Sequence, residues 1–215
     1  MNYTALIVAA GSGKRVGLGY NKLLYKLKSG KTILETTVEI FLKDMRCKQV
    51  IVVASATDMH SYANLFSCGR VVFVLGGKTR QESVSNGLNA VKEDVVLIHD
   101  GARPWLDANY IDEILETMKD AKACMLCVPV KDTIKKIENG VVKCTISRQD
   151  VYLAQTPQAF YTDKIINAYD KANANHFIAT DDASVYEQFG TDEIKVIIGS
   201  YDNIKITTQE DIKGR

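Results

Sequence analysis

Residues 5–15 read Ala-Leu-Ile-Val-Ala-Ala-Gly-Ser-Gly-Lys-Arg, an apolar run followed by a glycine-rich segment and two cations. A run without polar residues is typical of a strand that is buried on both faces of a parallel sheet. Gly11 and Gly13 allow a sharp turn that brings backbone N–H groups against a ligand. Arg15 and Lys22 add the positive charge that several anionic oxygens need. The stretch therefore predicts a strand that ends in a phosphate-binding loop.

Two commoner phosphate loops do not fit this segment. A Walker loop needs Gly-x4-Gly-Lys-Ser/Thr, but Val8 stands at its first glycine and Arg15 at its metal-binding hydroxyl. The dinucleotide fingerprint Gly-x-Gly-x-x-Gly is broken by Val16, with Gly17 one place late. For this segment alone, a plain turn with solvated cations remains an alternative.

Composition limits the classes of protein that the chain can belong to. Its 215 residues, of which 46% are hydrophobic and 25% charged, suffice for one domain over residues 1–215. The net charge of +1 gives no broad attraction for nucleic acid or for a membrane surface, so neither is expected as a partner. No apolar stretch reaches the length of about 18 residues that a membrane helix needs, and no signal peptide precedes the first strand. Five cysteines form no even framework, so we expect free thiols in a cytoplasmic protein.

Strand-like runs alternate with helical patterns along most of the chain. The expected strands are 6–10, 50–54, 71–75, 95–99, 125–130, 152–160 (running into a turn), 194–198 and 204–206. The expected helices are 32–42, 79–91, 108–118, 164–172 and 182–189, opened by capping residues at Thr79 with Glu82, at Asp107, and at Thr180 to Asp182. This alternation predicts an α/β, Rossmann-like protein with an open and mostly parallel sheet.

Unusual residues follow the carboxyl ends of the expected strands, where such sheets bind ligands. Gly76-Gly77 follows the third strand, and His99-Asp-Gly-Ala-Arg-Pro104 follows the fourth. Asp100 and Arg103 favour a ligand or metal contact, although a mutual ion pair that closes the loop is the alternative. Lys205, within an apolar run near the carboxyl end, is compatible with ordinary surface exposure.

Residues 131–150 have the pattern of a β-hairpin arm around a type I′ turn at Asn139-Gly140. A tight turn without a bulge pairs residue 133 with residue 146 and leaves Thr133 on the same face as Arg148. An isolated hairpin is marginal in water, so we expect the arm to dock on the second subunit of a homodimer. The alternative is an exposed arm with solvated lysines.

Taken in series, these segments resemble the family of 2-C-methyl-D-erythritol 4-phosphate cytidylyltransferases. The matching segments are the glycine loop with Lys22, Gly76-Gly77 with Ser83, residues 99–104, Asp132-Thr133, Arg148, residues 155–158, residues 180–184 and residues 202–207. The resemblance implies a three-layer nucleotidyltransferase fold, a homodimer whose arm enters the neighbouring site, and CTP and a sugar-alcohol phosphate as substrates. It also implies Mg²⁺, held mainly by the CTP phosphates rather than by a protein metal site.

The resemblance also assigns roles to individual residues. The catalytic residues it implies are Arg15 and Lys22 on the triphosphate, and Lys205 and Arg148 on the incoming phosphate. The substrate-binding residues it implies are Ala10, Gly11, Gly77, Gly101 and Ser83 around cytidine, Asp100 and Arg103 at the sugar alcohol, and Thr133, which arrives with Arg148 from the partner subunit. The implied reaction transfers CMP from CTP to 2-C-methyl-D-erythritol 4-phosphate in isoprenoid precursor synthesis.

Two positions depart from the usual family pattern. Asn21 stands where proline is common, which predicts a less rigid loop, and Lys78 stands where an acidic residue is frequent. A ribitol 5-phosphate cytidylyltransferase, a nucleotidyltransferase acting on a hexose phosphate, and a nucleotide-binding regulator without turnover remain alternatives, because similarity of fold does not fix the substrate.

Overall fold

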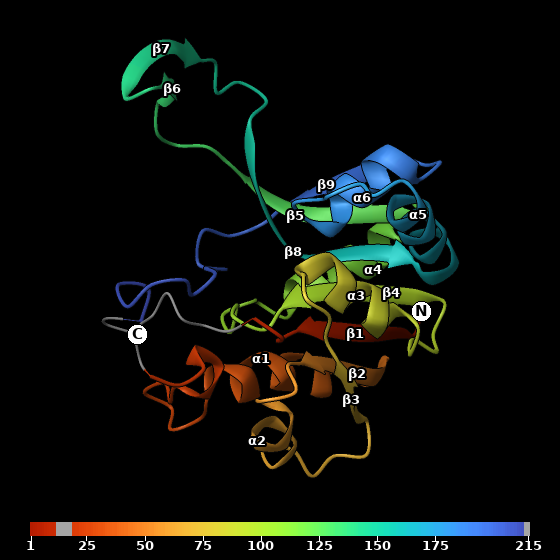
Figure 1. Cartoon of the computed structure of the whole chain (residues 1–215). Helices are drawn as coiled ribbons and strands as arrows, with labels where there is room; N and C mark the ends of the chain where they lie inside the picture. The colour runs from red at the N-terminus through yellow and green to blue at the C-terminus, as the bar shows by residue number, and fades with distance from the viewer. Residues whose placement is uncertain (12–18, 213–215) are drawn as a thin grey trace.

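The computed structural model describes residues 1–11 and 19–212 and has an α/β architecture with a projecting hairpin (Figure 1). Within these residues the strands are β1 (Tyr3–Val8), β2 (Cys47–Ala54), β3 (Val71–Leu75), β4 (Val95–Asp100), β5 (Ala123–Pro129), β6 (Ile134–Glu138), β7 (Val141–Ile146), β8 (Tyr152–Tyr161) and β9 (Ile194–Ile198). The helices are the 3-10 helix η2 (Lys22–Leu24), α1 (Ile33–Leu42), α2 (Met59–Ala63), α3 (Arg80–Leu88), α4 (Asn109–Thr117), α5 (Thr162–Ala174) and α6 (Asp182–Phe189).

In the described part of the chain, seven strands form the central sheet in the order β3-β2-β1-β4-β8-β5-β9. The β1 strand pairs in parallel with β2 and β4, and β5 pairs in parallel with β9. Only β8 of this sheet, as described, runs antiparallel to its neighbours β4 and β5. The prediction of a mostly parallel sheet is confirmed, and the register sets Val8 beside Asp100 at the carboxyl edge.

Alternation along β1 divides the core into two halves. Tyr3, Ala5 and Ile7 pack into the cluster that contains α1 and α4, whereas Leu6 packs into the cluster that contains α3, α5 and α6. Successive strand residues point to opposite faces, so an uninterrupted apolar strand fills both halves. The protein consequently has the three layers that the family resemblance implies.

Side-chain caps mark the starts of α1, α3 and α6. The predicted cap at Asp107 is wrong: Ala108 is the N-cap residue of α4, without a side-chain cap bond, and the Asp107 carboxylate accepts from the Asn109 N–H. Thr32 and Glu35 form a reciprocal capping box at α1, and Asp181 with Ser184 does so at α6. At α3 the Thr79 hydroxyl accepts from the Glu82 N–H, but the Glu82 carboxylate accepts from Lys78 instead of completing the box. Strand and helix bounds otherwise differ from those expected by a few residues, as the end of α3 at Leu88 rather than at residue 91 illustrates.

Two C-terminal predictions are wrong. The segment 152–160, predicted as a strand that runs into a turn, is strand throughout. It stays in the sheet through Pro157 because the buried Gln158 side chain binds the amino end of α6 and the Thr156 hydroxyl accepts from the Asp100 N–H. The register of β8 against β5 is irregular at this point, which is where a sheet tolerates proline. Residues 204–206 form no strand, although the Ile206 N–H donates to the Ala102 carbonyl.

The hairpin forms as expected around its turn but not in the expected register. Asn139 and Gly140 have φ values of 52° and 76°, as a type I′ turn requires. The pairing shifts between Lys136 and Ile137, so that residue 146 faces Ile134 rather than residue 133. The bulge is a local irregularity that turn chemistry does not encode, and the predicted pairing of Thr133 is therefore wrong.

All five cysteines are free thiols, and Cys124 and Cys127 are buried in β5 as expected for core residues. Among the described helices, none combines the length and the apolar character needed to cross a bilayer.

Candidate active site

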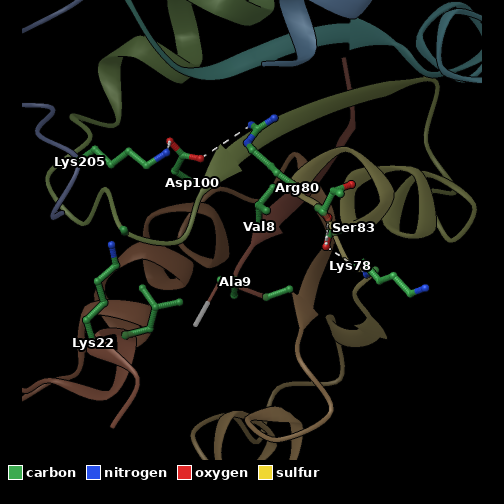
Figure 2. Close-up of a pocket in the computed structure, with 14 residues that line it drawn as sticks. Val8, Ala9, Lys22, Lys78, Arg80, Ser83, Asp100 and Lys205 are labelled. Carbon is green, nitrogen blue, oxygen red and sulfur yellow. Dashed lines mark hydrogen bonds and ion pairs between the residues drawn. The ribbon is translucent and has the colours of Figure 1, made fainter. Parts of the chain in front are cut away.

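A cavity of about 520 Å³ opens beyond the carboxyl ends of β1 and β4, within the range typical of small-molecule sites. Its lining comes from the end of β1, η2, the start of α3, the end of β4 and the segment after β9 (Figure 2). The residues predicted for the site that line this cavity are Ala10, Gly11, Lys22, Gly77, Ser83, Asp100 and Lys205. Segments far apart in the sequence therefore meet at one edge of the sheet, as parallel-sheet topology predicts.

The other predicted residues lie elsewhere. Arg15 falls outside the described residues. Gly101 and Arg103 follow β4 but are not part of the cavity lining, and Thr133 and Arg148 lie on the arm. Figure 1 shows the arm extended away from the sheet, and the cavity lining includes no residue of the arm.

Asp100 is the electrostatic centre of the cavity. Its carboxylate lies 2.9 Å from Lys205 Nζ, 3.3 Å from Arg103 Nε and 3.8 Å from Arg80 Nη2. Burial alone would raise the pKa of Asp100, but the charges of Lys205, Arg80 and Arg103 outweigh burial and hold the pKa well below its usual range. The carboxylate stays ionised and fixes Lys205, which is therefore a lysine of the cavity rather than an ordinary surface residue.

Arg103 forms the ion pair with Asp100 that its sequence position left open as one of two alternatives. The side chain is only 10% exposed, pairs with Asp100, and donates from Nη1 to the Asn203 carbonyl at 2.6 Å. It thus closes its own loop by an ion pair and also joins the end of β4 to the segment that carries Lys205.

Arg80 is a cavity residue that the sequence reasoning missed. It forms a two-pronged ion pair with Asp182, at 2.9 and 2.7 Å, and Asp182 is fully buried and also accepts from the Tyr169 hydroxyl at 2.6 Å. Figure 2 shows Arg80 and Lys205 approaching Asp100 from opposite sides. The available signal was its position as the first residue of α3, three residues after Gly77, but its partner is 102 residues away in sequence.

His99 supports the same edge from within the core. Its Nε2 lies 3.1 Å from the Arg103 carbonyl, which can only accept, so Nε2 carries the proton and Nδ1 accepts from the Thr156 hydroxyl. Burial lowers the pKa of His99 to about 4. The neutral ring therefore orients Thr156, whose oxygen in turn accepts from the Asp100 N–H.

Backbone packing explains the glycines after β3. A Cβ on Gly76 would lie 2.5 Å from Ala10 Cβ, and one on Gly77 would lie 2.3 Å from Glu82 Cβ. The Ser83 hydroxyl accepts from the Gly77 N–H and donates to the Thr79 carbonyl, so Ser83 holds this turn against α3. The Lys78 side chain points away from Asp100 in Figure 2.

Lys22 faces the same cavity from η2. Its ammonium donates to the Ile206 carbonyl at 2.5 Å, next to Lys205, so the cations that surround the cavity come from η2, α3 and the segment after β9. Such an array suits a polyphosphate together with a second phosphate.

An open α/β sheet with glycine turns and cations around one edge cavity fits the nucleotidyltransferase class. The chain belongs to the 2-C-methyl-D-erythritol 4-phosphate cytidylyltransferase family, whose sequence model matches residues 3–214. It is thus a cytidylyltransferase of isoprenoid biosynthesis.

Individual relatives agree with this family. The cytidylyltransferase of Bacillus licheniformis is 40% identical, with 99% of this chain and 93% of the relative covered. That of Halalkalibacterium halodurans is 42% identical, with coverage of 99% and 94%. Among solved structures, the Francisella tularensis enzyme of the same name has a TM-score of 0.85 at 33% identity, covering 99% of this chain and 97% of that chain.

Proposed function

We propose that the described cavity binds CTP and 2-C-methyl-D-erythritol 4-phosphate together and joins them directly. A phosphate oxygen of the acceptor attacks the α-phosphorus of CTP, and the bond from that phosphorus to the β-phosphate oxygen breaks. The products are 4-diphosphocytidyl-2-C-methyl-D-erythritol and pyrophosphate. This reaction needs positioning and positive charge rather than a covalent nucleophile. The convergence of Lys205, Arg80 and Asp100 beside the glycine turns is the observation that carries the proposal.

The cations divide between the two substrates in this proposal. Lys22, with Arg15 by family resemblance, stabilises charge that develops on the triphosphate. Lys205, held by Asp100 at 2.9 Å, orients the acceptor phosphate. Ser83 and the backbone at Ala10, Gly11, Gly77 and Gly101 surround the base, where the lack of Cβ atoms at the glycines lets the main chain approach closely.

The described residues do not form a protein cage for Mg²⁺. Asp100 is the carboxylate of the cavity lining, and it is already engaged by cations, while the described chain holds no cluster of three or more metal-binding side chains. We infer that Mg²⁺ enters with the phosphates of CTP, as this ion commonly does. The protein's own residues then bind and orient the nucleotide.

The arm supports a homodimer in which each cavity is completed by its neighbour. Ile137, Val141 and Val142 are more than half exposed, and the arm that carries Thr133 and Arg148 extends away from the cavity of its own chain (Figure 1). A symmetric dimer would cover these apolar side chains and bring Arg148 to the partner's cavity. The five free thiols suit a reducing cytoplasm as the place of action.

Mixing two inactive variants tests the exchange of arms. If Lys22→Ala and Arg148→Ala chains form mixed dimers, one site of each mixed dimer keeps Lys22 from one chain and Arg148 from the other. Random pairing of equal amounts then restores about a quarter of the wild-type sites. If both residues serve the same chain's site, the mixture stays as inactive as its parents, which would refute the exchange.

Pyrophosphate release from CTP with Mg²⁺ tests the acceptor. We expect release with 2-C-methyl-D-erythritol 4-phosphate and little with ribitol 5-phosphate at the same concentration. Selective release with ribitol 5-phosphate would keep the chemistry but overturn the acceptor. CTP binding without any release would favour a regulator instead.

A further inference from the structure

Asn21 directly precedes Lys22, and its side chain is buried although it is polar, with 6% exposed. The amide uses both donor hydrogens and its carbonyl oxygen. Nδ2 donates to the Gly11 carbonyl and to Asp58 Oδ2, each at 2.8 Å, and Oδ1 accepts from the Leu23 N–H at 3.1 Å. A buried amide with this many bonds is costly to disturb, because each partner it leaves behind loses its hydrogen bond.

These bonds join three segments that the sheet brings to one edge. Gly11 follows β1, and Asp58 follows β2 and also accepts from the Ser55 hydroxyl at 2.7 Å. Leu23 belongs to η2, the short helix that begins with Lys22. Asn21 is thus the junction between the strand ends and the helix that carries Lys22.

The backbone of Asn21 has φ −65° and ψ 125°. Its φ is the value that a proline ring imposes covalently. Asn21 reaches this conformation without a ring, and its side-chain bonds hold the residue there. A less rigid loop was expected because Asn21 replaces a proline. That expectation did not include the side-chain hydrogen bonds of Asn21, which the sequence does not reveal.

We propose that Asn21 is a positioning residue that fixes Lys22 toward the triphosphate by hydrogen bonds that hold the backbone at a proline-like angle. A lysine side chain is flexible, so the direction in which its ammonium points depends on how firmly its backbone is placed. The role of Lys22 on the triphosphate rests on the proposed function, whereas the bonds of Asn21 do not.

Three substitutions separate backbone placement from the side chain itself. Asn21→Asp keeps the shape but sets a carboxylate against the Gly11 carbonyl and Asp58, and we expect kcat/KM for CTP to fall about 100-fold. Asn21→Ala removes the bonds and should lower it about 10-fold, while Asn21→Pro restores φ without them and should lower it only about threefold. Asn175→Asp, in which an exposed amide also loses a bond to a backbone carbonyl, is the matched control with wild-type kinetics.

The second readout is direct binding of CTP and of CMP, with the melting temperature measured on every variant. We expect CTP to bind more weakly to Asn21→Asp while CMP, which lacks the β- and γ-phosphates, binds as it does to the wild type. Equal losses for the two nucleotides, or Asn21→Pro no better than Asn21→Asp with folded protein in both, would overturn the inference. If the wild type releases no pyrophosphate, the proposed function fails, and the binding comparison still decides the role of Asn21.

Discussion

The cavity edge and the hairpin arm of residues 131–150 are built in opposite ways. Side chains from distant segments cross-link the edge, as Arg80 does with Asp182 and Arg103 with the Asn203 carbonyl. On the arm every residue except Ile134 is exposed. Its base has one clear attachment, where Lys131 lies 3.5 Å from the centre of the Tyr201 ring. The edge is fixed by tertiary contacts, whereas the arm has its shape from a local turn and ladder.

The difference indicates where each region obtains its stability. Buried charges at the edge must be paired, so the loss of one partner leaves another uncompensated. The exposed arm makes few such paired contacts within its own chain, and its exposed apolar side chains can contact a partner. Damage to the edge should therefore affect both folding and catalysis, and damage to the arm should affect catalysis more than the stability of the body.

Lys22→Ala should have the largest effect on turnover, with a fall in kcat of about 1,000-fold, because a cation that stabilises developing charge is lost. The fold should remain, since the Lys22 side chain is only partly buried. Steady-state pyrophosphate release measures the loss, and Lys26→Ala, an exposed lysine nearby, is the control. A near-normal kcat would contradict the placement of Lys22 at the triphosphate.

Asp100→Asn should lower kcat/KM for the acceptor about 100-fold, since Lys205 loses the carboxylate that holds it. The same change should reduce the free energy of unfolding by about 3 kcal/mol, because buried cations lose their partner. Acceptor kinetics and urea unfolding measure the two effects. Asp112→Asn, which breaks only the exposed pair with Arg46, should cost less than about 1 kcal/mol. An unchanged acceptor KM together with wild-type stability would disprove the role of Asp100.

His99 should make the edge sensitive to acid. The unfolded ring takes up a proton below about pH 6.5. The folded ring does so only near its lowered pKa of about 4. Its stabilising contribution is therefore present above pH 6.5, and about 3 kcal/mol is lost as the pH falls through this window to 4. Urea unfolding between pH 7 and pH 4 should show this loss, on top of the contribution of Asp100 near the acid end.

His99→Gln isolates the contribution of the imidazole. The variant should be less stable at pH 7 but should lose less stability on acidification than the wild type. If the two proteins lose the same free energy between pH 7 and pH 4, His99 is not the group responsible.

The smallest effect is expected on the arm. Gly140→Ala forces a side chain into a residue with φ 76° but meets no atom within 4 Å, so only backbone strain of about 1 kcal/mol results. Amide exchange should accelerate in β6 and β7 while the melting temperature of the body hardly changes. Gly77→Ala is the counterpart at the edge, where the new Cβ would lie 2.3 Å from Glu82 Cβ, and it should weaken CTP binding. Equal effects of the two substitutions would remove the distinction between the regions.

Local patterns were good predictors wherever a feature depends on neighbouring residues. The apolar run before Gly11 predicts a buried central strand, Thr79 and Asp181 predict helix starts, and Asn139-Gly140 predicts the turn of the arm. The edge of the sheet was also predictable, because parallel strands end together. Most of the proposed cavity residues followed from that rule.

The wrong or missing predictions concern contacts between residues that are far apart in the sequence. Residues 152–160 are predicted to run into a turn, but buried side chains on both sides of Pro157 hold the whole segment in the sheet as β8. The bulge at Lys136 shifts the register of the arm without a sequence signal. Arg80 was recognised as a cavity residue only through its ion pair with Asp182, because no sequence-spacing rule connects the two residues.

The sequence by itself determined the α/β alternation, the glycine turns, the helix caps and the edge at which the site lies. Each of these depends on side-chain periodicity or on backbone conformations that a few adjacent residues set. The tertiary structure decided which charges pair around Asp100, which tautomer His99 adopts and how Asn21 holds Lys22. Those features depend on distances between segments and on burial, which changes the free energy of a charge or an unpaired donor far more than sequence position does.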